Sequence, residues 1–174
     1  MKRKLRAAST VCSFFLFSVA WYTVAPPIIY FASVTLLPLV EEVVKTFSFK
    51  QVRWNLRVCV ALTILFIILE SVFKYVAAHG EFHIPGFNAI LTYLLVFSPL
   101  ALHAFNMALS ITMNQRRISF PIIVLTCSAF HYTYNIYRAI LPLQLYLLFI
   151  LDTTILVVAT VTMLKSSHAA RALG

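Results

Sequence analysis

The feature that most constrains the fold of this chain is a series of long apolar stretches separated by short polar connectors. Hydrophobic residues make up 61% of the sequence and charged residues only 11%, whereas an ordinary soluble domain carries about 25% charged residues. Because a helix needs about 20 residues to cross a bilayer, a chain of 174 residues has room for about six spans. We expect an all-α, polytopic membrane bundle that forms a single transmembrane domain over residues 1–174.

The boundaries of the helices follow from the apolar runs and the residues that interrupt them. We expect helices at residues 9–25, 27–49, 57–78, 87–113, 118–139 and 142–164. Prolines mark several of the starts, where a missing N–H costs little, and residues 79–86 form the clearest loop. The basic residues at the start precede an apolar run without a clear small-residue cleavage site, so we expect an uncleaved first helix.

Positive charge predicts the orientation of these spans. The net charge is +9, and the basic residues lie at both ends of the chain, between helices two and three, and between helices four and five. Connectors rich in Lys and Arg stay in the cytoplasm, so we expect both termini on the cytoplasmic side. Because the cations are spread over several connectors and do not form one patch, we expect no nucleic-acid partner.

Ionisable side chains lie deep within several of the expected spans. Glu41, Glu70, His103 and His131 fall on four different helices, each near the bilayer midplane at a rise of about 1.5 Å per residue. An ionisable group in hydrocarbon is costly and usually marks function. We therefore expect one polar cluster that combines groups from four helices.

The neighbours of these residues suggest how they are held. Glu41 and Lys45 share a helical face at i, i+4, where they can pair, while Glu42 points about 100° away. His131 and Asn135 share a face in the same way, and Asn135 suits an oxyanion donor. Structural roles also fit several residues: Glu70 in a salt bridge, for example with Lys74, and Asp152 paired with Arg138. Cys12, Cys59 and Cys127 lack metal-like spacing and are expected to be packing residues.

The order of the polar residues resembles the PrsW family of intramembrane proteases, which is related to the CAAX-processing and bacteriocin-immunity (CPBP) proteases. The matching features are Glu-Glu-x-x-Lys from Glu41, a lone Glu70, His103, and His-x-x-x-Asn from His131. The resemblance covers residues 37–135. Ser71 and Lys74 stand where the family usually has Asn and Tyr.

The resemblance implies catalytic or ligand roles for Glu41, Glu42, Glu70, His103 and His131, with Asn135 assisting. The implied activity is an endopeptidase that hydrolyses a peptide bond in a membrane-embedded or membrane-proximal substrate. Two mechanisms fit. In the first, Glu41 or Glu42 activates water without a metal; in the second, Glu70, His103 and His131 hold Zn²⁺ and another glutamate is the general base.

Two other functional classes are consistent with the sequence. His79, Glu81 and His83 could collect a cation in the outer loop, and with the buried acids they suggest a small cation or proton transporter. A common transporter architecture usually shows an internal repeat, and we see none between the halves. The second alternative is a non-enzymatic membrane protein of the same fold that binds a partner.

Overall fold

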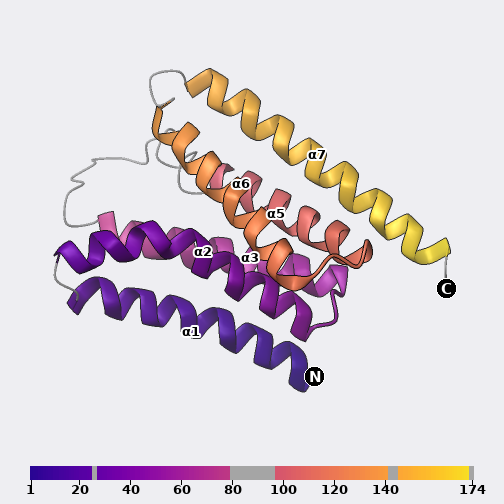
Figure 1. Ribbon diagram of the computed structural model, residues 1–174, viewed down its shortest axis with the longest axis horizontal. Helices are drawn as coiled ribbons and strands as arrows, with labels where there is room; N and C mark the ends of the chain where they lie inside the picture. Colours follow the sequence, from indigo (N-terminus) through magenta and orange to yellow (C-terminus); the bar gives the residue numbers. More distant parts are fainter. Residues whose placement is uncertain (25–26, 79–96, 141–144, 173–174) are drawn as a thin grey trace. The chain divides into compact units, whose positions relative to one another are not determined.

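The computed structural model describes the backbone of residues 1–24, 27–78, 97–140 and 145–172, and the side chains of residues 1–21, 36–72, 97–137 and 147–165. These residues form six helices: α1 Lys2–Val24, α2 Pro27–Gln51, α3 Leu56–Ala78, α5 Ser98–Gln115, α6 Phe120–Ile140 and α7 Leu145–Ala172 (Figure 1). The predicted all-α, six-helix architecture is confirmed for the described residues.

The helix bounds differ most from the predicted ones at the two ends of the chain. Helix α1 begins at Lys2 and α7 continues to Ala172, whereas the apolar runs predicted a start at 9 and an end at 164. Lys, Arg and Ala are good helix formers, so the helices continue into polar segments that a hydropathy argument treats as ends. The start of the predicted helix 87–113 and the predicted loop 79–86 lie outside the described residues.

Helices α2 and α5 end in the same backbone arrangement. Arg53, Trp54 and Arg117 adopt positive φ angles of 54°, 56° and 60°. After α2, the Trp54 N–H donates to the Phe49 carbonyl at 2.9 Å; after α5, the Ile118 N–H donates to the Met113 carbonyl at 3.1 Å. This is the Schellman arrangement, which usually places Gly in the left-handed position. Here arginine occupies that position at the end of both helices.

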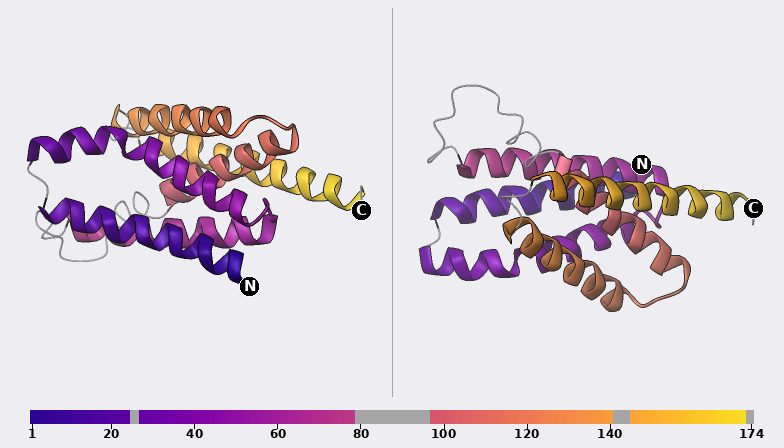
Figure 2. Two further views of the ribbon diagram at one scale, coloured as in Figure 1. Left: turned by 60° about the horizontal axis from the view of Figure 1, so that its bottom comes forward. Right: turned by 90° about the horizontal axis from the view of Figure 1, so that it is seen from above.

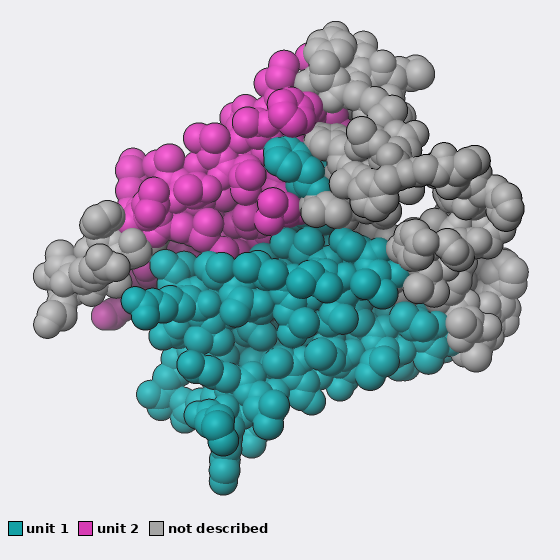
Figure 3. Space-filling model, turned by 180° about the vertical axis from the view of Figure 1, so that it is seen from behind, with its two compact units in different colours: residues 1–99 teal, residues 100–174 magenta. Residues whose placement is uncertain are grey.

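The chain divides into two compact units, Met1–Pro99 and Leu100–Gly174 (Figure 3). In the first, which we call unit 1, α1 packs on α2 and α3, and α2 packs on α3 (Figure 2). Its core joins Val11 and Phe15 of α1 to Phe66 of α3, with Val44 of α2 against them. The rings of Phe15 and Phe66 meet edge to face, 4.8 Å apart. Aromatic packing therefore fixes α1 against the helices that carry the acids.

In unit 2, residues 100–174, small residues let the helices approach closely. Ala104 and Ala108 of α5 pack against Ala159 of α7, and close approach through alanine is typical of helix pairs in membranes. A second cluster joins all three helices: Ala101 and Leu102 of α5, Tyr134 of α6 and Ile155 of α7.

Polar side chains are buried and apolar side chains are exposed on the same helices of unit 1. On α3, Ile64, Ile68 and Val72 are 50%, 54% and 55% exposed, whereas Thr63 and Glu70 are buried. On α2, the exposed residues include Leu36, Val40, Val43 and Phe47, while Glu41, Glu42, Lys45 and Thr46 are buried. Buried polar residues are the informative part of this distribution, because acids and lysines are almost never fully buried unless they are paired.

Within the described residues, one helical segment, Leu147–Lys165, is long and apolar enough to cross a bilayer by length and composition. A single segment of this kind is weak support for membrane insertion. The six spans, the single transmembrane domain over residues 1–174 and the cytoplasmic termini stay predictions.

Candidate functional site

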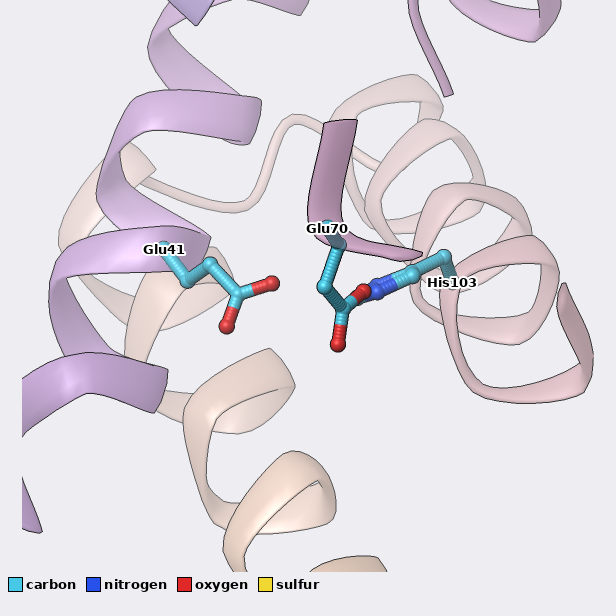
Figure 4. Close-up of side chains that lie close together, drawn as sticks. All are labelled: Glu41, Glu70 and His103. Carbon is cyan, nitrogen blue, oxygen red and sulfur yellow. The ribbon is translucent and has the colours of Figure 1, made fainter. Parts of the chain in front are cut away.

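Two acids from neighbouring helices lie close together in unit 1. Glu41 of α2 and Glu70 of α3 are only 5% and 6% exposed, and one carboxylate oxygen of each lies within 4.8 Å of the other. Glu41 reaches from α2 towards Glu70 (Figure 4). Pro38 lies inside α2, one turn before Glu41, and an interior proline removes one helical hydrogen bond. The predicted approach of these two acids is thus present within unit 1.

Lys45 holds the second acid of the Glu-Glu pair. Its ammonium nitrogen forms an ion pair with Glu42 Oε1 at 2.5 Å, one helical turn back, and lies 5.1 Å from the ring centroid of Phe66 on α3. The i, i+4 spacing favoured Glu41 as its partner, but residues at i, i+3 are equally close on a helix surface. The structure therefore assigns Glu42 to a buried ion pair.

Lys45 interacts with all three acids of this unit that the structure describes. It is electrostatically coupled to Glu42, Glu41 and Glu70. Two carboxylates that share a site do not both ionise readily. Acids held this close together are typical of acid-base and metal sites.

The two predicted histidines lie side by side in unit 2. His103 of α5 and His131 of α6 are both buried, and their ring centroids are 5.8 Å apart with an interplanar angle of 75°. A neutral imidazole offers one donor nitrogen and one acceptor nitrogen. The pair can therefore donate a hydrogen bond and accept a proton at one place. Asn135, one turn beyond His131, is half-buried.

The sequence argument missed Asn106. It lies one turn after His103 on α5, is buried, and donates a hydrogen bond from Nδ2 to the Cys127 carbonyl of α6 at 3.3 Å. Ser110 Oγ lies 3.2 Å from Cys127 Sγ. The position of Asn106, three residues after His103, could have identified it as a candidate site residue, because residues i and i+3 share a helical face. Cys127 is buried and is not part of a disulfide, and these polar contacts extend its predicted packing role.

Asp152 of α7 accepts a hydrogen bond from a tyrosine of the neighbouring helix. The Tyr134 hydroxyl of α6 donates a hydrogen bond to Asp152 Oδ1 at 2.5 Å, and both side chains are buried. Tyr134 lies three residues after His131. The pair therefore joins α7 to the helix that carries the histidine. Arg138, the partner expected from the sequence, lies outside the described side chains, as do Lys74, His79, Glu81 and His83.

Several of these residues could hold a metal. Glu41, Glu70 and His103 are buried, and each offers one ligand atom, a carboxylate oxygen or a ring nitrogen (Figure 4). This set differs from the predicted zinc ligands Glu70, His103 and His131 by including Glu41. Carboxylate oxygen and imidazole nitrogen are both common zinc ligands, so the donor types fit a zinc ion.

No protein-family model matches this chain, and comparisons with curated proteins and with solved structures likewise found no match. Function is therefore inferred from the residues themselves.

Proposed function

We propose that this protein is an intramembrane endopeptidase in which buried glutamates and histidines activate water to hydrolyse a peptide bond. The observation that carries the proposal is the approach of Glu41 and Glu70, two buried carboxylates with oxygens within 4.8 Å. Such a pair places like charges together where burial already makes charge costly. It does suit a group that exchanges protons during a reaction.

The distribution of apolar residues supports a membrane location. Helices α2 and α3 expose aliphatic and aromatic side chains and bury their acids, and α7 contains an apolar segment long enough to span a bilayer. Large exposed apolar surfaces are rare on soluble monomers. The substrate is then a membrane-embedded or membrane-proximal segment of a protein or peptide.

Glu41 is the proposed general base. Lys45 compensates the charge of Glu42 through an ion pair, so Glu42 positions Lys45, and Glu41 is left to act with Glu70. Glu41 removes a proton from water while the water oxygen bonds to the scissile carbonyl carbon. The carbon–nitrogen bond then breaks, and the proton passes to the leaving amine.

The histidines complete the proposed centre. We assign His103, His131 and Asn135 to orienting the substrate carbonyl and donating hydrogen bonds to the developing oxyanion. The resemblance to the PrsW family implies these roles. In the alternative mechanism with a metal, Glu41, Glu70 and His103 would hold a zinc ion. The ion would polarise the same carbonyl as a Lewis acid and activate the water, and Glu41 would then be a ligand and not the general base.

The test is peptide cleavage by the purified protein in detergent. Glu41→Gln should lower kcat by about 10²–10⁴-fold, the usual contribution of a general base, while Glu41→Asp should retain part of the activity because it keeps a carboxylate. Thr153→Ala, at an exposed position on α7, is the control and should cleave like the wild type. Full activity of Glu41→Gln would contradict the proposal.

A chelator distinguishes the two mechanisms. Loss of cleavage with 1,10-phenanthroline, restored by added Zn²⁺, supports metal-assisted hydrolysis, and unchanged cleavage supports the metal-free version. Metal content measured by mass spectrometry on wild type and on His103→Ala provides a readout that is independent of activity.

The buried acids also favour a second candidate, a small cation or proton transporter. Buried carboxylates inside a membrane commonly mark ion pathways. Reconstitution into vesicles separates the two classes: cation or proton flux that Glu41→Gln abolishes, in a protein that cleaves no peptide, would favour transport.

A further inference from the structure

A pocket at one end of unit 1 brings together basic residues that are far apart in the sequence. The start of α1 supplies Lys2, Arg3 and Lys4, and the α2–α3 connector supplies Arg53, with Asn55 and Val52 beside it. The two segments lie at the same end of the unit (Figure 1). The pocket has a volume of about 460 Å³, which lies within the range of small-molecule sites, about 300–1,000 Å³.

The charged side chains that line this basic pocket are all positive. Four of its lining residues are cations, and none of the described residues that line it is acidic. Four of the five acids in the chain lie elsewhere in this unit or in unit 2, buried within α2, α3 and α7. Like charges that converge on one cavity raise its potential, and such a cavity attracts and holds anions.

The backbone at Arg53 is held in an unusual conformation beside the pocket. Arg53 and Trp54 have consecutive φ angles of 54° and 56°, a region that is sterically unfavourable for a residue with a Cβ atom. The Arg53 N–H donates to the Lys50 carbonyl at 3.0 Å. The side chain therefore projects from a fixed turn. Non-glycine residues in such conformations are concentrated at ligand-binding sites.

We propose that this basic pocket binds a phosphate-bearing anion. Arginine presents a planar fork that matches two phosphate oxygens, and lysine adds compact positive charge. Three lysine and arginine side chains from α1 and one arginine from the α2–α3 connector surround the space, so a phosphate group can contact both segments at once. The phosphate can belong to an anionic lipid headgroup or to a soluble compound, and the experiment separates these sources.

Binding is measured on the purified full-length protein in detergent, by native mass spectrometry for lipids and by calorimetry for soluble anions. The probes are dioleoyl phosphatidic acid, dioleoyl phosphatidylcholine with the same acyl chains, and inorganic pyrophosphate. We expect saturable binding of phosphatidic acid, pyrophosphate or both, in preference to phosphatidylcholine. Arg53→Ala and Lys4→Ala should each raise the Kd about tenfold, the usual loss for a charged hydrogen bond.

Matched controls remove a charge from the same segments without touching the pocket. Arg57 at the start of α3 and Arg6 of α1 are exposed and are not among the lining residues. Arg57→Ala and Arg6→Ala should leave the Kd within about twofold, because exposed charges outside a site are screened by salt. Circular dichroism spectra and melting curves establish that all variants are folded.

Binding of phosphatidic acid alone assigns the pocket to a lipid headgroup, and binding of pyrophosphate assigns it to a soluble phosphate compound. The proposal is overturned if neither probe binds more tightly than phosphatidylcholine, or if the control variants weaken binding as much as Arg53→Ala. None of the pocket residues takes part in the proposed hydrolysis. The two proposals can therefore fail separately.

Discussion

The buried polar residues of the two units differ in kind. Unit 1 buries charged groups, with Glu42 and Lys45 in an ion pair and Glu41 close to Glu70. In unit 2, imidazole, amide and hydroxyl groups predominate, such as His103 and Asn106, with Asp152 as the buried acid. The first set can exchange a proton or hold a cation, whereas the second is suited to directing hydrogen bonds. The polar groups that each unit buries are thus specialised for different chemistry.

If this comparison is right, loss of Lys45 should have the largest effect on stability. Lys45→Met leaves Glu42 buried without its cation, which costs about 3–5 kcal/mol when one partner of a buried ion pair is removed. Melting curves in detergent should show a large fall in Tm. The double variant Lys45→Met with Glu42→Gln should recover most of the loss, because it removes the charge as well. A single variant as stable as the wild type would show that the pair has no stabilising role.

In unit 2, loss of the tyrosine hydroxyl should have a smaller effect. Tyr134→Phe removes the hydrogen-bond donor to Asp152 and should reduce the free energy of unfolding by about 1–3 kcal/mol, since a buried acceptor loses its donor. Thermal melting measures the change. Tyr137→Phe provides the control, because Tyr137 is exposed on the same helix. Equal shifts for the two variants would argue against a specific role for the Asp152 contact.

The smallest expected effect is a gain in stability, and it comes from a substitution in the connector after α5. Glycine adopts positive φ without the steric cost that arginine bears, so Arg117→Gly should stabilise the end of α5 by about 1 kcal/mol. The Tm should rise slightly in chemical or thermal melts. The reference variant is Arg116→Gly, which changes the neighbouring residue without a positive φ and should not stabilise. A fall in Tm for Arg117→Gly would indicate that its side chain makes a necessary contact.

The sequence predicted the backbone of this protein better than it predicted the side-chain contacts. In the part of the chain that the structure describes, the helices and their approximate centres followed from apolar runs and prolines, because those patterns are local. The helix ends were wrong where helix-forming polar residues extend α1 and α7. For the site, the approach of Glu41 to Glu70 agrees with their equal predicted depth in neighbouring helices. The partner of Lys45 and the contacts of Asn106 depend on rotation and packing, which spacing along one helix does not specify.

By itself, the sequence determined that this chain forms apolar helices with a small set of ionisable residues inside them, since composition and periodicity act over a few turns. Only the tertiary structure decided which charged residues come together. Lys2, Arg3, Lys4 and Arg53 are spread over separate segments, and the sequence argument treated them as dispersed charge. The packing of α1 on α2 and α3 brings them to one pocket. The physical reason is that contacts between distant segments depend on how helices cross, and this is set by the shapes of all the side chains between them.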